Sequence, residues 1–226
     1  ISNPQKYFDD NISAFFNLLD CLKKYKSTKI FYASSSSVYG DSKSYPVKEN
    51  FDTNPKNFYG LSKKINEQIA NIYFKNFKMK LIGLRFFTVF GEWGRPDMLL
   101  IKFFDYQKKN KIFTINNSGN HYRDFTYIKD VNKILFMLTK KENFKFHKIY
   151  NLSSGKPKKI KKIINILSKI TKYKKLKNGP LQKVEAIKTY GDSSLIKKIT
   201  GINKFTKLEV GIKNTFNWYH KYKKLI

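Results

Sequence analysis

The sequence predicts an α/β fold built on a parallel β-sheet, with helices connecting successive strands. Short apolar runs typical of buried strands alternate with longer stretches whose apolar residues recur at helical spacing. A chain that alternates strands and helices in this way forms a parallel sheet with right-handed crossovers. Its 226 residues are enough to bury a substantial core, as one domain or as one domain with a small additional lobe.

The order of the expected elements follows from these two periodicities. Helices are expected over residues 4–25, 58–77, 98–110, 128–139 and 160–171, with shorter ones near 193–199 and 207–222. Strands are expected over residues 29–34, 81–86, 111–115 and 148–152. The run 81–86 is apolar on both faces, as buried parallel strands are. Prolines and glycines predict loops over 41–57 and 91–97.

The formal net charge of +30 allows two interpretations. Such a charge is typical of proteins that bind nucleic acids or anionic membranes. The lysines, however, are spread over nearly every segment, and no known nucleic-acid-binding motif is present. We therefore expect solvated lysine-rich faces and no specific nucleic-acid partner.

Neither a bilayer-length apolar stretch nor a secretory leader is visible, so we expect a cytoplasmic protein without a membrane partner. The single cysteine, Cys21, lies in an apolar helical pattern and is expected to fill the core.

Candidate catalytic residues lie between positions 34 and 63. The stretch "FYASSSSVYG" places four serines where the strand 29–34 ends, and the helix over 58–77 begins with "FYGLSKK". Tyr59 and Lys63 are four residues apart on that helix and therefore lie on the same side. A nearby ammonium favours the phenolate form of a tyrosine, which can then take a proton from an alcohol. A serine at the strand end could hydrogen-bond the same substrate oxygen.

Arginine is rare in this chain, since only Arg85, Arg95 and Arg123 are found among 46 basic residues. The planar guanidinium binds carboxylate or phosphate through two parallel hydrogen bonds, which lysine cannot do. The pattern favours anion-binding roles over three chance surface positions. Arg85 lies at a strand end, where a structural role is also open.

The motifs "ASSSSVYG", "YGLSK", "LRFFTVFGEWGRPDM" and "RDFTYIKDV" appear in one order along the chain. In that order they resemble the extended short-chain dehydrogenase/reductases of the NAD-dependent epimerase/dehydratase family. Within it, the combination "RFFTVFGEWGRPDM" most resembles the UDP-glucuronate 4-epimerases. The resemblance implies a Rossmann-like doubly wound parallel sheet with a smaller C-terminal α/β substrate-binding lobe. It also implies bound NAD, a UDP-sugar substrate and a homodimer formed by the helices at 4–25 and 58–77.

The resemblance also implies roles for individual residues. Ser35 matches the catalytic Ser/Thr, Tyr59 the base and Lys63 its partner, and Tyr59, Lys63 and Phe86 are placed against NAD. The positions implied to bind the substrate are Ser36, Ser37, Thr88, Arg95, Arg123 and Glu185.

Two of these substrate positions separate possible reactions. Dehydratases of the family carry acidic residues after the catalytic Ser/Thr, where this chain has Ser36 and Ser37. Dehydration is therefore not expected, and these hydroxyls, with Thr88 and Arg95, suit a hexuronate carboxylate. Arg123 matches an arginine that holds the diphosphate.

Glu185 matches the position of an aspartate that binds the uridine ribose in relatives. Their local Gly-Asp is Val184-Glu185 in this chain.

The family's glycine-rich G-x-x-G-x-x-G turn, which cradles the cofactor pyrophosphate, has no counterpart in this sequence. We therefore expect residues 1–90 to be the C-terminal part of the NAD-binding domain, with the N-terminal half of that domain missing. Residues 91–226 are expected to form mainly the nucleotide-sugar lobe, with segments at about 112–152 returning to the Rossmann sheet. We expect a chain of this kind to be inactive alone.

Three alternatives stay open from the sequence. The reaction could be that of another nucleotide-sugar epimerase, such as one acting on UDP-glucose and UDP-galactose, or of a UDP-glucuronate decarboxylase. A non-enzymatic alternative is a basic binding module on a truncated scaffold. Retention of Ser35, Tyr59 and Lys63 with all three arginines argues against that module. For the epimerase, we expect a role in capsule or lipopolysaccharide precursor synthesis.

Overall fold

The main sheet is parallel and has the strand order β1-β2-β7 in the computed structural model. The structure describes residues 3–25, 27–180 and 186–222. The strands are β1 (Lys29–Ser35), β2 (Lys80–Phe86) and β7 (Lys148–Leu152). Their register aligns Ser35 with Phe86 and Phe86 with Leu152, so the carboxyl ends of all three strands meet at one edge. Within the described part of the chain, β1 is an outer strand of this sheet.

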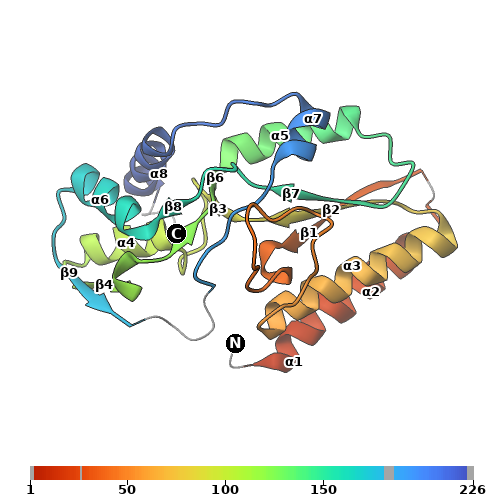
Figure 1. Cartoon of the computed structure of the whole chain (residues 1–226), viewed down its shortest axis with the longest axis horizontal. Helices are drawn as coiled ribbons and strands as arrows, with labels where there is room; N and C mark the ends of the chain where they lie inside the picture. Colours follow the sequence, from red (N-terminus) through yellow and green to blue (C-terminus); the bar gives the residue numbers. More distant parts are fainter. Residues whose placement is uncertain (1–2, 26, 181–185, 223–226) are drawn as a thin grey trace.

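Helices cover both faces of the main sheet (Figure 1). One face carries α2 (Ala14–Leu22) and α3 (Phe58–Phe77), and the other carries α5 (Ile128–Lys141) and α7 (Ser194–Thr200). Each face of the sheet packs into its own hydrophobic core, and neighbouring residues of β2 point into different cores. Leu81 packs in the core on the α2/α3 side, and Ile82 packs in the core on the α5/α7 side. This follows from the two-residue period of a strand, and it explains why the run is apolar on both faces.

The first helix contains a π-helical turn that periodicity did not predict. The expected helix over 4–25 consists of α1 (Pro4–Tyr7), a π-helical segment (Phe8–Ser13) and α2. Asn11 in this segment donates from Nδ2 to Ser62 Oγ at 2.9 Å and so ties the turn to α3. The expectation for Cys21 was wrong, because its side chain is exposed. The buried stripe of α2 instead centres on Leu19.

A second lobe stands beside the main sheet (Figure 1). Its helices are α4 (Leu99–Lys108), α6 (Ile160–Thr171) and α8 (Leu208–Tyr222), and β4 (Phe113–Asn116) pairs in parallel with β9 (Leu176–Gly179). Their shared core includes the fully buried side chains of Phe103, Phe104, Ile163, Leu167 and Ile212. Within residues 112–152, β4 therefore belongs to this lobe, whereas β7 pairs in the main sheet.

Four very short strands link the two parts. β3 (Thr88–Phe90) pairs in parallel with β6 (Phe125–Tyr127), and β5 (Tyr122–Arg123) pairs in antiparallel with β8 (Lys158–Lys159). Two or three residues are too few to show a periodicity, so the sequence did not predict them. Among the described residues, no helix is both long and apolar enough to cross a membrane.

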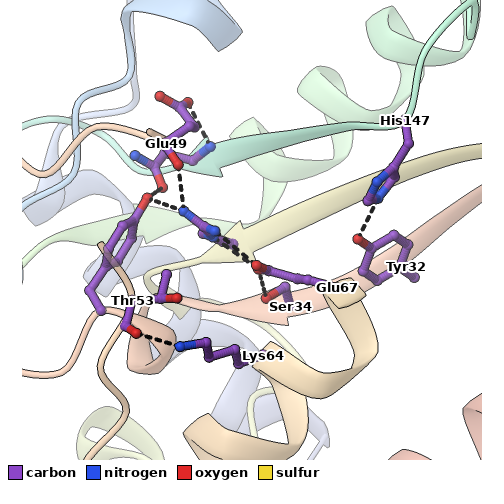
Figure 2. Close-up of polar contacts among 10 residues, drawn as sticks. Tyr32, Ser34, Glu49, Thr53, Lys64, Glu67 and His147 are labelled. Atoms are coloured by element: carbon purple, nitrogen blue, oxygen red, sulfur yellow. Dashed lines mark hydrogen bonds and ion pairs between the residues drawn. The ribbon is translucent and has the colours of Figure 1, made fainter. Parts of the chain in front are cut away.

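The half-buried His147 predicts a loss of stability in mild acid. Its Nε2 lies 2.8 Å from the hydroxyl of Tyr32 (Figure 2), and burial lowers the pKa of His147 to about 4. An unfolded histidine has a pKa of about 6.5, so between these values the unfolded chain binds more protons. The contribution of this residue to the free energy of unfolding is therefore complete above about pH 6.5 and decreases as the pH falls towards 4. The slope is at most about 1.4 kcal/mol per pH unit, and less because the ring is only partly buried.

We expect His147→Gln to flatten this acid dependence in urea denaturation between pH 6.5 and pH 4. A variant that loses stability with the same slope as the wild type would show that His147 is not the group responsible. The exposed His220→Gln is the matched control, and it should leave the slope unchanged.

Candidate active site

A cavity of about 1100 Å³ lies where the carboxyl ends of β1 and β2 face the second lobe. Its walls come from the first helix, the two strand ends, the loop over 91–95 and the start of α4. The structure brings together here most of the residues singled out from the sequence. Those that line the cavity are Ser35, Ser36, Ser37, Tyr59, Phe86, Thr88, Arg95 and Arg123.

The serine run turns from strand to helix at the edge of the cavity. Ser35 is the last residue of β1, and its Oγ accepts a hydrogen bond from the backbone N–H of Ser37 at 3.1 Å. This bond caps the 3₁₀ turn Ser36–Val38, as a serine before a helical turn often does. Ser35 is buried, whereas Ser36 and Ser37 are half-buried. The Oγ of Ser34, the residue before Ser35, donates to the buried Glu67 carboxylate at 2.5 Å.

Tyr59 and Lys63 lie in the first turns of α3. The side chain of Asn57 caps this helix by accepting from the backbone N–H of Gly60 at 2.8 Å. The Lys63 Nζ lies 5.9 Å from the centre of the Tyr59 ring, so the two side chains face the same side, as their spacing predicted. Burial lowers the pKa of Lys63. Tyr59 lines the cavity, whereas Lys63 is not among its lining residues.

The donors of this pair fit a nicotinamide nucleotide. Among the described residues, neither the Tyr59 hydroxyl nor the Lys63 ammonium makes a hydrogen bond or an ion pair. A half-buried ammonium with unused donors can hydrogen-bond ribose hydroxyls, and the ring of Phe86 adds an apolar wall. The residues present therefore fit the nicotinamide end of NAD. The sequence holds no glycine-rich turn for the pyrophosphate.

Arg95 presents its guanidinium from the exposed loop between β3 and α4. Its Nε donates to Asp97 Oδ1 at 3.0 Å and its Nη2 to Asp97 Oδ2 at 2.6 Å, in the bidentate geometry of an arginine–carboxylate pair. This ion pair lowers the pKa of Asp97. Arg95 thus already holds a carboxylate in the manner expected for an anionic ligand. Thr88, the first residue of β3, lines the same cavity and is half-buried.

Arg123 reaches the cavity from β5, next to a buried carboxylate. Its Nη1 donates to the backbone oxygen of Tyr122 at 2.9 Å. The neighbouring Asp124 is fully buried and accepts from Ser154, through both N–H at 3.0 Å and Oγ at 2.6 Å. It also accepts from the N–H of Gly155 at 3.1 Å and of Gly191 at 3.4 Å. Asp124, between β5 and β6, therefore joins the segment after β7 and the segment at Gly191 next to Arg123, which the sequence did not show.

Other lining residues were missed from the sequence. The first helix contributes a polar group to the wall: Asn3, Lys6, Tyr7, Asp10 and Asn11. The Tyr7 and Tyr59 rings lie 6.1 Å apart, so this helix stands directly against the candidate base. The π-helical turn changes which residues face inward, and regular helical spacing therefore could not identify them.

Glu185 lies outside the described residues, and its expected contact with a ribose stays a prediction. The described residues that line the cavity closest to it along the chain are Ala186 and Thr189. Over the described ranges, no three His, Cys, Asp or Glu side chains gather in a way that could hold a metal ion.

The cavity lies outside the carboxyl ends of the strands of a parallel sheet, which is where α/β proteins with open sheets bind their ligands. Residues 1–153 match the family described as the NAD dependent epimerase/dehydratase family. The chain belongs to this family.

Several curated proteins and solved structures are similar to the chain. UDP-glucuronate 4-epimerase 5 of Arabidopsis thaliana is 37% identical over 237 residues, covering 97% of this chain and 54% of the plant protein. Protein CapI of Staphylococcus aureus is 32% identical over 243 residues, covering 99% of this chain and 72% of that protein. The chain thus spans about half the length of the plant relatives.

Among solved structures, the UDP-glucuronic acid 4-epimerase of Bacillus cereus in complex with UDP-glucuronic acid and NAD has a TM-score of 0.86 at 29% identity. The alignment covers 96% of this chain and 68% of the Bacillus chain. Both the sheet and the second lobe of this chain are therefore present in that enzyme.

Proposed function

We propose that the protein is a cytoplasmic NAD-dependent nucleotide-sugar 4-epimerase that interconverts UDP-glucuronate and UDP-galacturonate through a transient 4-keto sugar. The observation that supports this most strongly is one cavity lined by Ser35, Tyr59 and Arg95 together. Similarity to the plant UDP-glucuronate 4-epimerases and to the Bacillus enzyme supports the same substrate. We also propose that the product serves capsule or lipopolysaccharide precursor synthesis. Loss of galacturonate from surface polysaccharide in a deletion strain tests that role.

In the proposed mechanism Tyr59 takes the proton of the sugar 4-hydroxyl, and Ser35 hydrogen-bonds the same oxygen. The Lys63 ammonium stabilises the phenolate of Tyr59 and donates to the nicotinamide ribose. NAD held against Tyr59, Lys63 and Phe86 would supply the acceptor for the hydride from C4 and the donor for its return. The 4-keto sugar turns over in the cavity between these two events, so its other face is presented for the return. Tyr59 then gives its proton back to the oxygen at C4.

The substrate carboxylate is proposed to lie between the serine turn and the β3–α4 loop. Ser36, Ser37 and Thr88 offer hydroxyl donors, and Arg95 offers the planar fork that a carboxylate fits. Positions 36 and 37 hold serines and not the acidic residues that would support dehydration. Arg123 is proposed to bind the diphosphate.

We also propose where the two domains divide. Residues 1–90, together with the later strand β7, form the part that binds NAD, and most of residues 91–226 form the lobe that binds the nucleotide sugar. Glu185 is placed by resemblance on the uridine ribose of that lobe.

Product analysis tests the proposal against its alternatives. The full-length protein is incubated with NAD and either UDP-glucuronate or UDP-glucose, and the nucleotide sugars are separated by chromatography. UDP-galacturonate is expected. UDP-xylose would instead identify a decarboxylase, and turnover of UDP-glucose alone would identify a different epimerase.

A homodimer is proposed through α2 and α3, which lie side by side on the outer face of the main sheet (Figure 1). Both helices keep large apolar side chains exposed, namely Phe16, Leu18, Leu61, Ile72 and Phe77. Burying such side chains against a second copy would remove apolar surface from water.

Light scattering at micromolar concentration should give twice the monomer mass, and Ile72→Glu should shift the mass to that of a monomer. A wild type that stays monomeric would contradict the dimer.

A further inference from the structure

We propose that the buried ion pair between Arg85 and Glu67 is a positioning unit that holds Ser35 and Tyr59 in register for the proposed reaction. This inference rests on the proposed function, which assigns the chemistry to those two residues. Arg85 lies on β2 and Glu67 on α3, and Figure 2 shows Glu67 beside Ser34 of β1. Neither member lines the cavity itself.

The pair connects three elements, each of which supplies a site residue. Arg85 Nε donates to Glu67 Oε1 at 2.9 Å, and Nη2 donates to Oε2 at 2.8 Å. Ser34 Oγ donates to the same Oε1 at 2.5 Å. Ser34 directly precedes Ser35 on β1, and Arg85 directly precedes the cavity residue at the end of β2. Any tilt of this pair therefore moves the strand end that carries Ser35.

Glu67 transmits the same constraint to α3. It lies one helical turn after Lys63 and two turns after Tyr59, at positions that share one side of the helix. Its carboxylate is bound by Ser34 and Arg85 from the strands, so it fixes the rotation of α3 against β1 and β2. The rotation of α3 in turn decides where the Tyr59 hydroxyl lies.

The remaining donor group of Arg85 secures the far side of the serine turn. Its Nη1 donates to the Tyr39 hydroxyl at 2.8 Å and to the backbone oxygen of Glu49 at 3.0 Å. Tyr39 in turn donates to Asn151 Oδ1 on β7 at 2.7 Å. The guanidinium is thus held on every edge, and the serine turn is fixed at both its ends.

Stability alone does not require a charged pair at this place. Both side chains are buried, with exposed fractions of 5% for Arg85 and 8% for Glu67. Replacing a buried ion pair with apolar residues of similar volume is often neutral or stabilising, because the desolvation cost is removed. The two parallel hydrogen bonds of the pair instead fix the orientation of Glu67 relative to Arg85. Such precision matters because a catalytic group must be held within about 0.5 Å of its productive position.

The test compares Glu67→Gln and the double variant Glu67→Leu/Arg85→Met with the wild type. The double variant removes the directional hydrogen bonds of the ion pair but fills the same space with apolar side chains. It should therefore fold even if the single variant is unstable. We expect kcat to fall about 10²-fold in both, as misplacement by about 1 Å can cause. The KM for UDP-glucuronate should change much less than kcat, because Arg95 and Arg123, the charged groups proposed to bind it, lie outside the hydrogen-bonded cluster of Arg85 and Glu67. Wild-type kcat in a stable double variant would reduce the pair to a structural role.

The matched control is Glu142→Gln. Glu142 is a buried carboxylate bonded to Tyr150 and Lys148, away from the cavity, and its loss should lower stability without changing kcat. Crystal structures of the wild type and the double variant give a readout that needs no turnover. The distance between Ser35 Oγ and Tyr59 Oη should change by about 1 Å, and an unchanged distance would overturn the inference. An inactive wild type would contradict the proposed function alone, since this distance still tests the pair.

Discussion

Replacing Tyr59 with phenylalanine should lower kcat by about 10²–10⁴-fold, the range that general acid–base catalysis contributes. The phenol is the group proposed to take the proton from the 4-hydroxyl, and Lys63 Nζ lies 5.9 Å from the centre of its ring in this cavity. Phenylalanine keeps the ring and its packing. The affinity for UDP-glucuronate, measured by calorimetry, should therefore change by less than about threefold.

Tyr25→Phe is the control for this variant, because Tyr25 is exposed and does not line the cavity. It should retain wild-type turnover. If Tyr59→Phe kept activity within a few-fold of wild type, the base would have to be another group, and the proposed mechanism would be wrong at its first step.

Arg95→Lys should weaken the binding of UDP-glucuronate about tenfold or more while leaving UDP-glucose binding within about twofold. A hydrogen bond to a charged group is worth about 1.5–3 kcal/mol, and each 1.4 kcal/mol is a factor of ten in affinity. Lysine keeps the positive charge but cannot offer two parallel N–H groups, which Arg95 already directs at a carboxylate, that of Asp97. Calorimetric titration with each nucleotide sugar measures the difference.

Arg123→Lys is the matched control in these titrations. It is proposed to contact the diphosphate that both nucleotide sugars contain, so it should weaken the binding of both by similar factors. Equal losses for the two ligands in Arg95→Lys would show that this arginine does not recognise the carboxylate.

The long elements could be predicted from the sequence because their periodicities extend over many residues. The expected bounds of the helices 58–77 and 160–171 and of the strand 148–152 agree with α3, α6 and β7. The short strands β3, β5, β6, β8 and β9 were missed, since pairing with distant segments, rather than local pattern, defines them. The exposure of Cys21 was missed because the segment is largely apolar, whereas Cys21 lies two residues after Leu19, the buried residue of α2, and so faces away from the core.

Much of the candidate site could be located from the sequence because its residues follow a strand end or begin a helix. Ser35 and Tyr59 are of this kind, and the structure brings both to one cavity. The buried contacts between Glu67, Ser34 and Arg85 could not be predicted. Glu67 looks like any acidic residue on an amphipathic helix, and only the fold brings it to Ser34 and Arg85. Their roles in catalysis stay predictions for the experiments above.

The most direct measurement follows UDP-glucuronate by NMR in D₂O with the full-length protein and NAD. Direct return of the hydrogen to C4 predicts UDP-galacturonate that still carries protium at C4, in a mixture that reaches the same composition from either sugar. Deuterium at C4, formation of UDP-xylose, or unchanged UDP-glucuronate would contradict 4-epimerisation through a 4-keto sugar at this site.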